Sequence, residues 1–149
     1  MRDLEVGLVD AKNHAEFLQR RADEAWGKYH SAGLARMILA PSSMDDMHVN
    51  ASKASVDVAS AKVDVAKAEL EIARLKFDLV TNAATKAKEA AERNHSLDGA
   101  AAKADGAAKD AKIAIDRANA ALTQAQEDLH TAEQALHNSI AAAVAGSSP

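Results

Sequence analysis

Apolar residues recur every seven positions through residues 56–79, and this pattern predicts a long amphipathic helix. Each repeat sets an acidic residue between two apolar ones, as in Val56-Asp57-Val58. A seven-residue period that persists over several repeats is typical of helices that pack in coiled coils. We therefore predict an all-α protein that is organised around this helix.

Two apolar stripes run along the predicted helix, roughly 160° apart at ~100° per residue. The first stripe is predicted to pack on the following helix, and it consists of Val58, Val65, Ile72 and Leu79. The second stripe is predicted to dock the preceding helix, and it consists of Val56, Val63, Leu70 and Phe77. Because a helix with one partner needs only one apolar stripe, two stripes predict two partner helices. A single broad core face is the alternative.

Helix-breaking and helix-capping residues divide the chain into three predicted helices. Pro41 ends the first helix because proline lacks an amide donor and disfavours helix at the residue before it. Ser43 followed by Asp46 resembles a capping box and predicts the start of the second helix. In the polar turn that follows, Ser96 and Asp98 are the candidates to cap the third helix. The predicted segments are helices at ~3–38, ~44–94 and ~100 or ~107 to 145, a turn at ~95–99 and a tail at 146–149.

The third predicted helix carries a single apolar seam. This seam consists of Ile115, Leu122, Leu129 and Leu136, accompanied by Ala111, Ala118, Ala125 and Ala132. If it packs antiparallel on the first stripe, Ile72 lies level with Leu122 and the hairpin is centred on Leu97, and a neighbouring register would shift this centre by half a heptad. Alanine on both helices permits a close approach of the backbones. We predict an elongated, Ala-rich antiparallel helical hairpin or coiled coil, with the N-terminal helix packed on its base, in a single domain of residues 1–149.

Residues ~81–114 are predicted to form a polar two-helix arm. The second stripe ends at Phe77, and the positions that continue the first stripe are Asn82, Lys86 and Glu89. The N-terminal helix, folded back from Pro41, is also expected to end near this level. Because helices in proteins owe most of their stability to packing, we expect this arm to be weakly held in a lone chain.

Composition and charge narrow the classes of function. The chain has 149 residues, 3% aromatic residues and a net charge of −4 with both signs mixed throughout, which disfavours nucleic acid as a partner. It has no cysteine, so disulfides and thiol chemistry are absent. Acidic residues near the N-terminus and the lack of a long apolar run predict neither a signal peptide nor a membrane span. We expect the protein in the cytoplasm or within a virion or other assembly.

Few residues are candidates for metal binding or catalysis. His130 and His137 share a helix face but lie ~10 Å apart along the helix, too far to ligate one ion together. Glu92 with His95 and Glu127 with His130 have the Glu-x-x-His spacing of di-metal bundles, yet the predicted hairpin sets them at different levels. The chain also lacks a Gly-rich phosphate loop and a nucleophile elbow. We predict a non-enzymatic protein with no catalytic residue, no metal site and no cofactor.

Residues ~51–143 resemble the long Ala-rich helical hairpins of periplasmic adaptor proteins from secretion and efflux systems. The likeness lies in residues 66–73, AKAELEIA, and in residues 120–129, AALTQAQEDL. It covers the hairpin alone and assigns no functional residue. The resemblance implies an adaptor that engages a channel or a secretion partner.

Two functions follow from this pattern as hypotheses. The first is a structural protein that self-associates through its long helices into a larger oligomer, such as a virion, tail, scaffold or filament component, with other structural proteins as further partners. Its contacts are predicted at exposed apolar residues, namely Val9, Phe17, Ile113 and Ile140. The alternative is the hairpin adaptor. A coat protein on a lipid surface is disfavoured because no helix face combines basic and aromatic residues.

Overall fold

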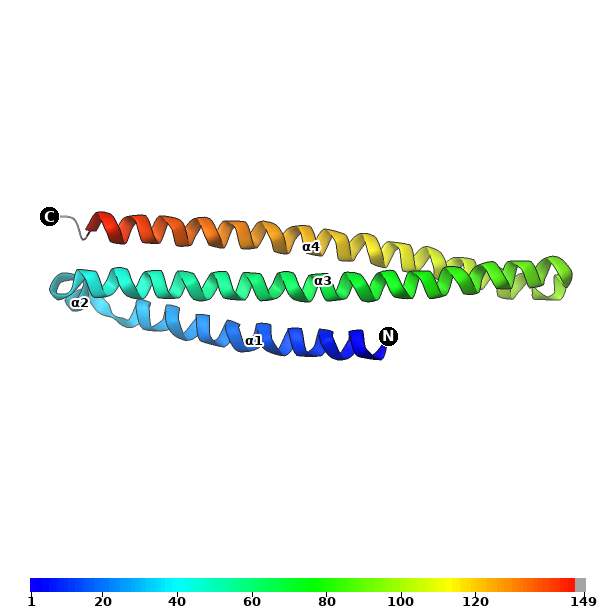
Figure 1. The fold of residues 1–149 in the computed structure, drawn as a ribbon, viewed down its shortest axis with the longest axis horizontal. Coiled ribbons are helices and arrows are strands. Elements are labelled where there is room, and N and C mark those ends of the chain that lie inside the picture. Colours follow the sequence, from blue (N-terminus) through cyan, green and yellow to red (C-terminus); the bar gives the residue numbers. More distant parts are fainter. Residues whose placement is uncertain (147–149) are drawn as a thin grey trace. The chain divides into compact units, whose positions relative to one another are not determined.

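The computed structural model describes residues 1–146, apart from the side chains of residues 34–36, and this part of the chain is almost entirely helical. Its elements are α1 (Arg2–Ser31), α2 (Gly33–Leu39), α3 (Pro41–Arg93), the 3-10 turn η1 (His95–Leu97) and α4 (Asp98–Gly146) (Figure 1). Helix accounts for 97% of the structure, residues 1–146 contain no strand, and α3 contacts both α1 and α4. The predicted all-α helical hairpin with an added N-terminal helix is therefore confirmed. Residues 147–149 of the predicted tail lie outside the described residues.

Contacts between residues group the chain into two compact units. Unit 1 comprises Met1–Leu8 and Ala66–Thr123, and unit 2 comprises Val9–Val65 and Gln124–Pro149. Helices α1, α3 and α4 each run continuously through a unit boundary, so both units contain segments of the same three helices. The single domain that the sequence predicts for residues 1–149 stays a prediction.

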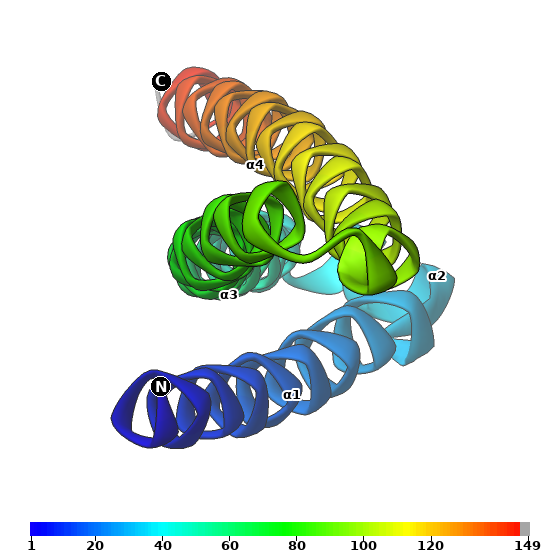
Figure 2. The same ribbon diagram turned by 90° about the vertical axis from the view of Figure 1, so that its right-hand side faces the viewer.

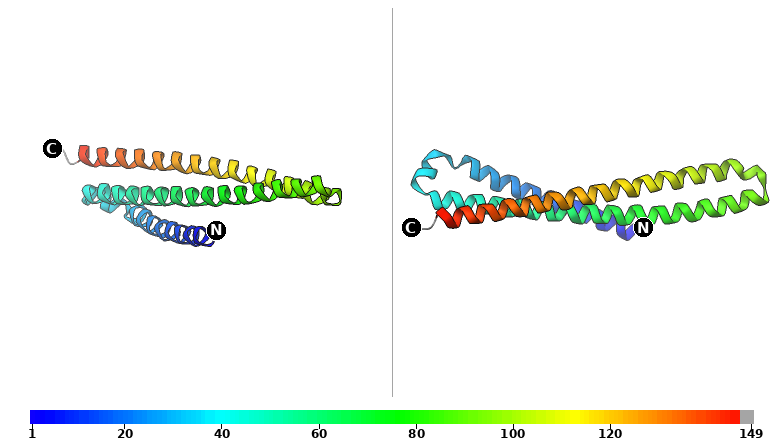
Figure 3. Two further views of the ribbon diagram at one scale, coloured as in Figure 1. Left: turned by 45° about the vertical axis from the view of Figure 1, so that its right-hand side comes forward. Right: turned by 90° about the horizontal axis from the view of Figure 1, so that it is seen from above.

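The first predicted helix is interrupted at Ala32, which the pattern of apolar residues did not indicate. Gly33 has a φ of 70°, a left-handed conformation that ends α1 and turns the chain into α2. At the end of α1 the Ser31 hydroxyl donates a hydrogen bond to the carbonyl of Lys28. The prediction of one helix over ~3–38 was therefore wrong at this break. Within unit 2, α2 forms the short link between α1 and α3 (Figure 3).

Helix α3 begins at Pro41, so the capping box predicted at Ser43 and Asp46 was wrong. Proline suits the first helical position, because its missing amide hydrogen would have no partner there and its φ is already helical. The carbonyl of Ala40 accepts the backbone amides of Ser43 and Met44, at 3.1 and 3.4 Å. Ala40 therefore precedes the first turn, and Ser43 lies inside the helix.

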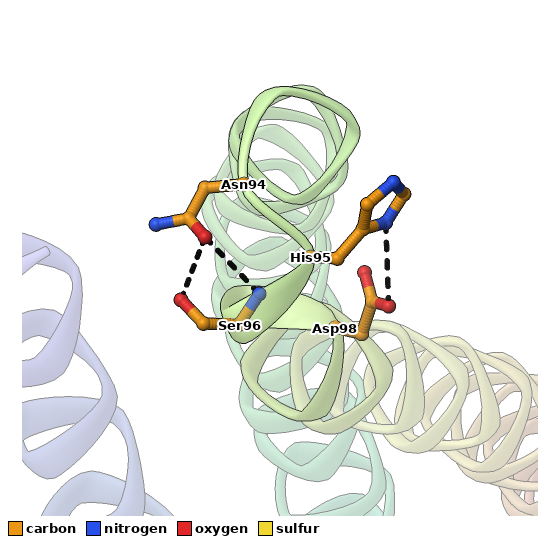
Figure 4. A network of polar contacts seen from close by, with 4 residues as sticks. All are labelled: Asn94, His95, Ser96 and Asp98. Atoms are coloured by element: carbon orange, nitrogen blue, oxygen red, sulfur yellow. Dashed lines mark hydrogen bonds and ion pairs between the residues drawn. The ribbon is translucent and has the colours of Figure 1, made fainter.

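The turn between α3 and α4 is closed by Asn94, and not by the predicted caps Ser96 and Asp98. The Asn94 side-chain Oδ1 accepts the backbone amide of Ser96 at 3.1 Å and the Ser96 hydroxyl at 2.8 Å (Figure 4). On the other side of the turn, His95 Nδ1 lies 3.6 Å from a carboxylate oxygen of Asp98. Helix α4 then starts at Asp98, before the earlier of the expected starts near residue 100, and continues through Gly106 without a break.

Candidate functional site

The contact between α3 and α4 in unit 2 contains a buried pair of serines. Ser52 is 3% exposed and Ser139 is 7% exposed, and their hydroxyl oxygens lie 3.0 Å apart. The Ser139 hydroxyl donates its only hydrogen to the carbonyl of Ala135 at 2.8 Å. Ser52 must therefore donate the hydrogen bond between the two helices, and Ser139 must accept it.

The contact between α1 and α3 in unit 2 is built from aromatic and histidine rings. Trp26 Nε1 donates a 2.8 Å hydrogen bond to the hydroxyl of Ser55. The ring of His48 meets Trp26 and Tyr29 edge to face, with centroids 5.3 and 4.9 Å apart, and His30 stacks on Trp26 at 5.8 Å. Rings at these distances and angles attract one another, and this attraction adds to the stabilisation gained by burying the rings. Trp26 and Tyr29 therefore join two helices, with no bound group needed to explain their positions.

These contacts assign the two stripes of α3 to the opposite partners from those predicted. Ser52, which bonds to α4, lies one helical turn before Val56 and so aligns with the second stripe. Ala54, which lines a hollow with Leu18 and Ala25 of α1, lies one turn before Val58 and aligns with the first stripe. In unit 2, therefore, α4 packs on the second stripe and α1 on the first, and Figure 2 shows these parts of α1 and α4 on different sides of α3.

The register of α3 against α4 in unit 2 is close to the predicted one. The bonded positions 52 and 139 are centred between His95 and Ser96. A side chain at Gly146 would lie 3.0 Å from the Asp45 carboxylate, which gives the same centre. The heptad pattern predicts a hairpin centred on Leu97, so the predicted and observed registers agree to within half a heptad.

The seam between α3 and α4 continues to the turn in unit 1 as a row of alanines. On α3 the second stripe extends beyond Phe77 through Val80, Ala84, Ala87 and Ala91, all of which are buried or half-buried. On α4 the half-buried positions that continue the predicted seam toward the turn are Ala101, Ala104, Ala108 and Ala111. The second stripe therefore does not end at Phe77, because alanines take the place of larger apolar residues. The predicted polar arm contains this alanine seam.

Most of the predicted packing residues are at least partly covered. Buried positions are Val58, Val63, Leu70 and Ile72, and half-buried positions are Val56, Val65, Phe77, Ile115, Leu122, Leu129 and Leu136. Leu79 differs, because 54% of its surface is exposed. In unit 1 it lines an open hollow of about 420 Å³ with Ile72, Val80 and Ala111, beside the seam between α3 and α4. Leu79 is therefore available for contacts outside the chain.

Several large apolar side chains lie on the surface of the described residues. The four predicted from the sequence are exposed by 55% at Val9, 50% at Phe17, 49% at Ile113 and 42% at Ile140. Met37, Ile38 and Leu39 of α2, which were not predicted as contact residues, are 56, 76 and 83% exposed. Three successive apolar residues were a usable signal, because consecutive residues of a helix point in different directions and one partner cannot cover them all.

The described residues bring no set of groups together that would indicate catalysis or metal binding. No group of three His, Asp or Glu side chains within residues 1–146 has the arrangement needed to hold a metal ion. The Glu-x-x-His candidate His130 instead contacts Gln134 one turn later, with their side-chain nitrogens 3.2 Å apart. None of the helices in the described part of the chain has the length and hydropathy that a bilayer span requires.

Comparison with known proteins finds no matching family, no similar curated protein and no similar solved structure. The packing of the helices and their exposed apolar residues are therefore the features that carry a functional proposal.

Proposed function

We propose that this protein is a non-enzymatic structural component that self-associates through its long helices into a larger oligomer. One observation carries the proposal, namely the contrast between the interior and the surface of the described chain. Among the described side chains, seven of the eleven buried apolar residues are alanine, whereas larger residues such as Phe17, Ile38 and Leu39 are at least half exposed. A chain that buries small side chains and exposes large ones gains stability when copies cover each other's surfaces.

The arrangement of the exposed residues supports a repeating assembly. Exposed apolar residues occur on α1, α2 and α4, so a subunit offers more than one surface to its neighbours. Surfaces that match between identical subunits give closed rings when the rotation closes and filaments when it does not. A virion, tail, scaffold or filament component is the class of protein that these features fit.

Light scattering coupled to size-exclusion chromatography tests the proposal. The wild-type chain is expected to form oligomers whose mass rises with concentration. Phe17→Asp and Ile140→Asp each place a charge in an exposed apolar contact and should shift the population toward monomer, whereas Gln126→Asp at an exposed polar position should not. A wild-type chain that stays monomeric at every concentration would contradict self-association.

The adaptor remains the second candidate, and one feature of the turn favours it. Leu97 lies at the α3–α4 turn and is 39% exposed, so this turn presents an apolar side chain among polar neighbours. A stable monomer that loses binding to a channel or secretion partner on Leu97→Asp would favour this function over self-association.

A further inference from the structure

Helix α1 has a second apolar face, directed away from the residues that pack on α3. It is one uninterrupted helix from Arg2 to Ser31, and its buried residues Ala15 and Ala22 lie on one side. At ~100° per residue, the side chains of Val6, Val9 and Phe17 lie together on roughly the opposite side. They are 53, 55 and 50% exposed. As with α3, two apolar faces on one helix indicate two partners.

The residues of this outer face are arranged symmetrically about Asn13. Val9 and Phe17 each lie four residues from Asn13, and Arg2 and Glu24 each lie eleven residues from it. In an antiparallel pair of α1 helices related by a two-fold axis at Asn13, Val9 of each copy meets Phe17 of the other. Arg2 of each copy then lies level with Glu24 of the other.

Charges on the flanks of this face also favour the antiparallel orientation. Asp3 and Glu5 stand in the first turn of α1, and Arg20 and Arg21 stand at the mirrored end. The antiparallel pair brings Glu5 near Arg20 and Asp3 near Arg21 of the other copy. These attractions outnumber the one repulsion on the same flank, between Glu5 and Asp23 of the other copy. A parallel pair would set acid against acid and arginine against arginine, which is unfavourable.

The two remaining acids near the centre do not oppose this pairing. Asp10 and Glu16 are level with each other across the two-fold axis, but they lie about 120° apart around the helix. In an antiparallel pair, a given flank of one helix lies beside the same flank of the other helix. Asp10 of one copy and Glu16 of the other are on different flanks, so the interface separates the two carboxylates. The opposed macrodipoles of antiparallel helices add a further favourable term.

We propose that a second copy of this chain docks antiparallel on the outer face of α1, with the two-fold axis at Asn13. This inference rests on the proposed self-association and identifies the surface and the orientation of one of its contacts. Val9 and Phe17 form the apolar centre, and Val6 lies level with Arg20 of the other copy. The acidic first turn of each copy meets the paired arginines of the other. Complementary charges of this kind select the partner and its orientation.

Single cysteine variants test the orientation, because the chain has no cysteine of its own. Asn13→Cys places two thiols together at the axis, so oxidation should yield a disulfide-linked dimer. Val6→Cys and Arg20→Cys each lie seven residues from the axis, which separates like thiols by about 21 Å along the helix. Neither should cross-link alone, but a mixture of the two should cross-link.

The outcomes of this experiment separate the two proposals. Cross-linking of Val6→Cys or Arg20→Cys alone as readily as Asn13→Cys would overturn the antiparallel orientation. Oligomers in light scattering without cross-linking at Asn13→Cys would overturn the α1 contact and leave self-association standing. A monomeric chain at every concentration would overturn both.

Charge reversal provides an independent test that does not need a new thiol. One variant combines Asp3→Arg with Glu5→Arg, and the other combines Arg20→Glu with Arg21→Glu. Each should raise its own dimer dissociation constant by about tenfold or more, because like charges then meet across the pair. An equimolar mixture restores opposite charges in every pair and should dimerise as well as the wild type.

Recovery of dimers in the mixture would also show that neither variant had failed to dimerise because it was unfolded. All four changed side chains are exposed, so circular dichroism should show unchanged helix content in both variants. Ile113→Asp, an exposed apolar position on α4, is the matched control and should not alter the Asn13→Cys cross-link. Folded variants that fail to dimerise when mixed would overturn the proposed pairing.

Discussion

The seam between α3 and α4 in unit 2 differs in kind from the seam near the turn in unit 1. In unit 2 it contains larger apolar residues such as Val63, Leu129 and Leu136, together with the buried hydroxyl pair of Ser52 and Ser139. Near the turn in unit 1 it consists almost entirely of alanine. Each methylene removed from water contributes about 0.8 kcal/mol, so an alanine seam stabilises the pairing far less per residue than a leucine seam.

The two parts of the seam supply different properties, namely close pairing of the helices and a defined register. Alanine has the highest helix propensity and permits close packing, so the alanine seam holds two straight helices near each other. It does not select a register, because a shift by one heptad sets alanine against alanine again. The serine pair has only one matching position, and a single polar group in a seam can specify the register. The serine pair therefore selects one alignment of α3 and α4 in unit 2, whereas the alanine seam in unit 1 tolerates several.

Introducing a carboxylate into each seam should have the largest effect and should expose the difference directly. Val63→Asp places an unpaired charge at a position that is 6% exposed in unit 2, and we expect it to lower the free energy of unfolding by about 3 kcal/mol or more. Ala84→Asp at a half-buried alanine of unit 1 should cost only about 1 kcal/mol, since its carboxylate can reach water. Urea denaturation followed by circular dichroism measures both, and equal losses would contradict the comparison.

Enlarging an alanine in the unit 1 seam should be the next largest effect. Ala91 is 6% exposed, so Ala91→Leu forces a larger side chain between closely packed helices and should cost about 2 kcal/mol. Ala102→Leu, on an exposed position of α4, is the matched control and should change the stability little. Thermal denaturation of both variants tests this, and a stabilised Ala91→Leu would show that the seam has room to spare.

The direction of the serine hydrogen bond predicts unequal effects for the two partners. Ser139→Ala removes the acceptor and leaves the buried Ser52 hydroxyl without it, which should cost about 1–2 kcal/mol. Ser52→Ala should cost about 0.5–1 kcal/mol, because the Ser139 hydroxyl keeps its bond to the Ala135 carbonyl. A double-mutant cycle by urea denaturation measures the coupling, and a coupling of zero would exclude the bond as a stabilising contact.

Two glycines should respond in opposite directions, by the smallest amounts. Gly106→Ala lies inside α4 with no atom near the added methyl group, so it should stabilise unit 1 by about 0.7–1 kcal/mol. Gly33→Ala imposes the left-handed conformation on a residue with a side chain and should cost about 1 kcal/mol or more. Thermal denaturation distinguishes them, and a stabilised Gly33→Ala would mean that the chain between α1 and α2 adopts another conformation.

The helices themselves were predictable because their signals are local. The seven-residue period of α3 and the alanines of α4 needed no knowledge of neighbours, and the polar segment after Arg93 marked the turn. Errors occurred where two local signals competed. Pro41 could equally end one helix or begin the next, and Gly33 became a break only because it took a positive φ.

The assignment of partners to the two stripes shows a different kind of error. The partner that follows α3 to the turn must pack on a stripe that also reaches the turn. Ala84 and Ala91 extend the second stripe that far, while Asn82 and Glu89 interrupt the first stripe. The sequence therefore contained the information, because alanines at Ala84 and Ala91 pack in the seam as larger apolar residues do.

By itself, the sequence determined that this chain forms long helices, where most of them break, and that α3 has two apolar faces. These properties depend on residues within a few positions of each other, whose spacing the helix geometry converts into faces. Only the tertiary structure decided that α4 takes the second stripe and that Ser52 donates to Ser139, 87 residues away. These pairings depend on which of the two apolar faces of α3 is stabilised more by packing on a helix that is distant in the sequence. The periodicity of one helix does not give that difference in free energy.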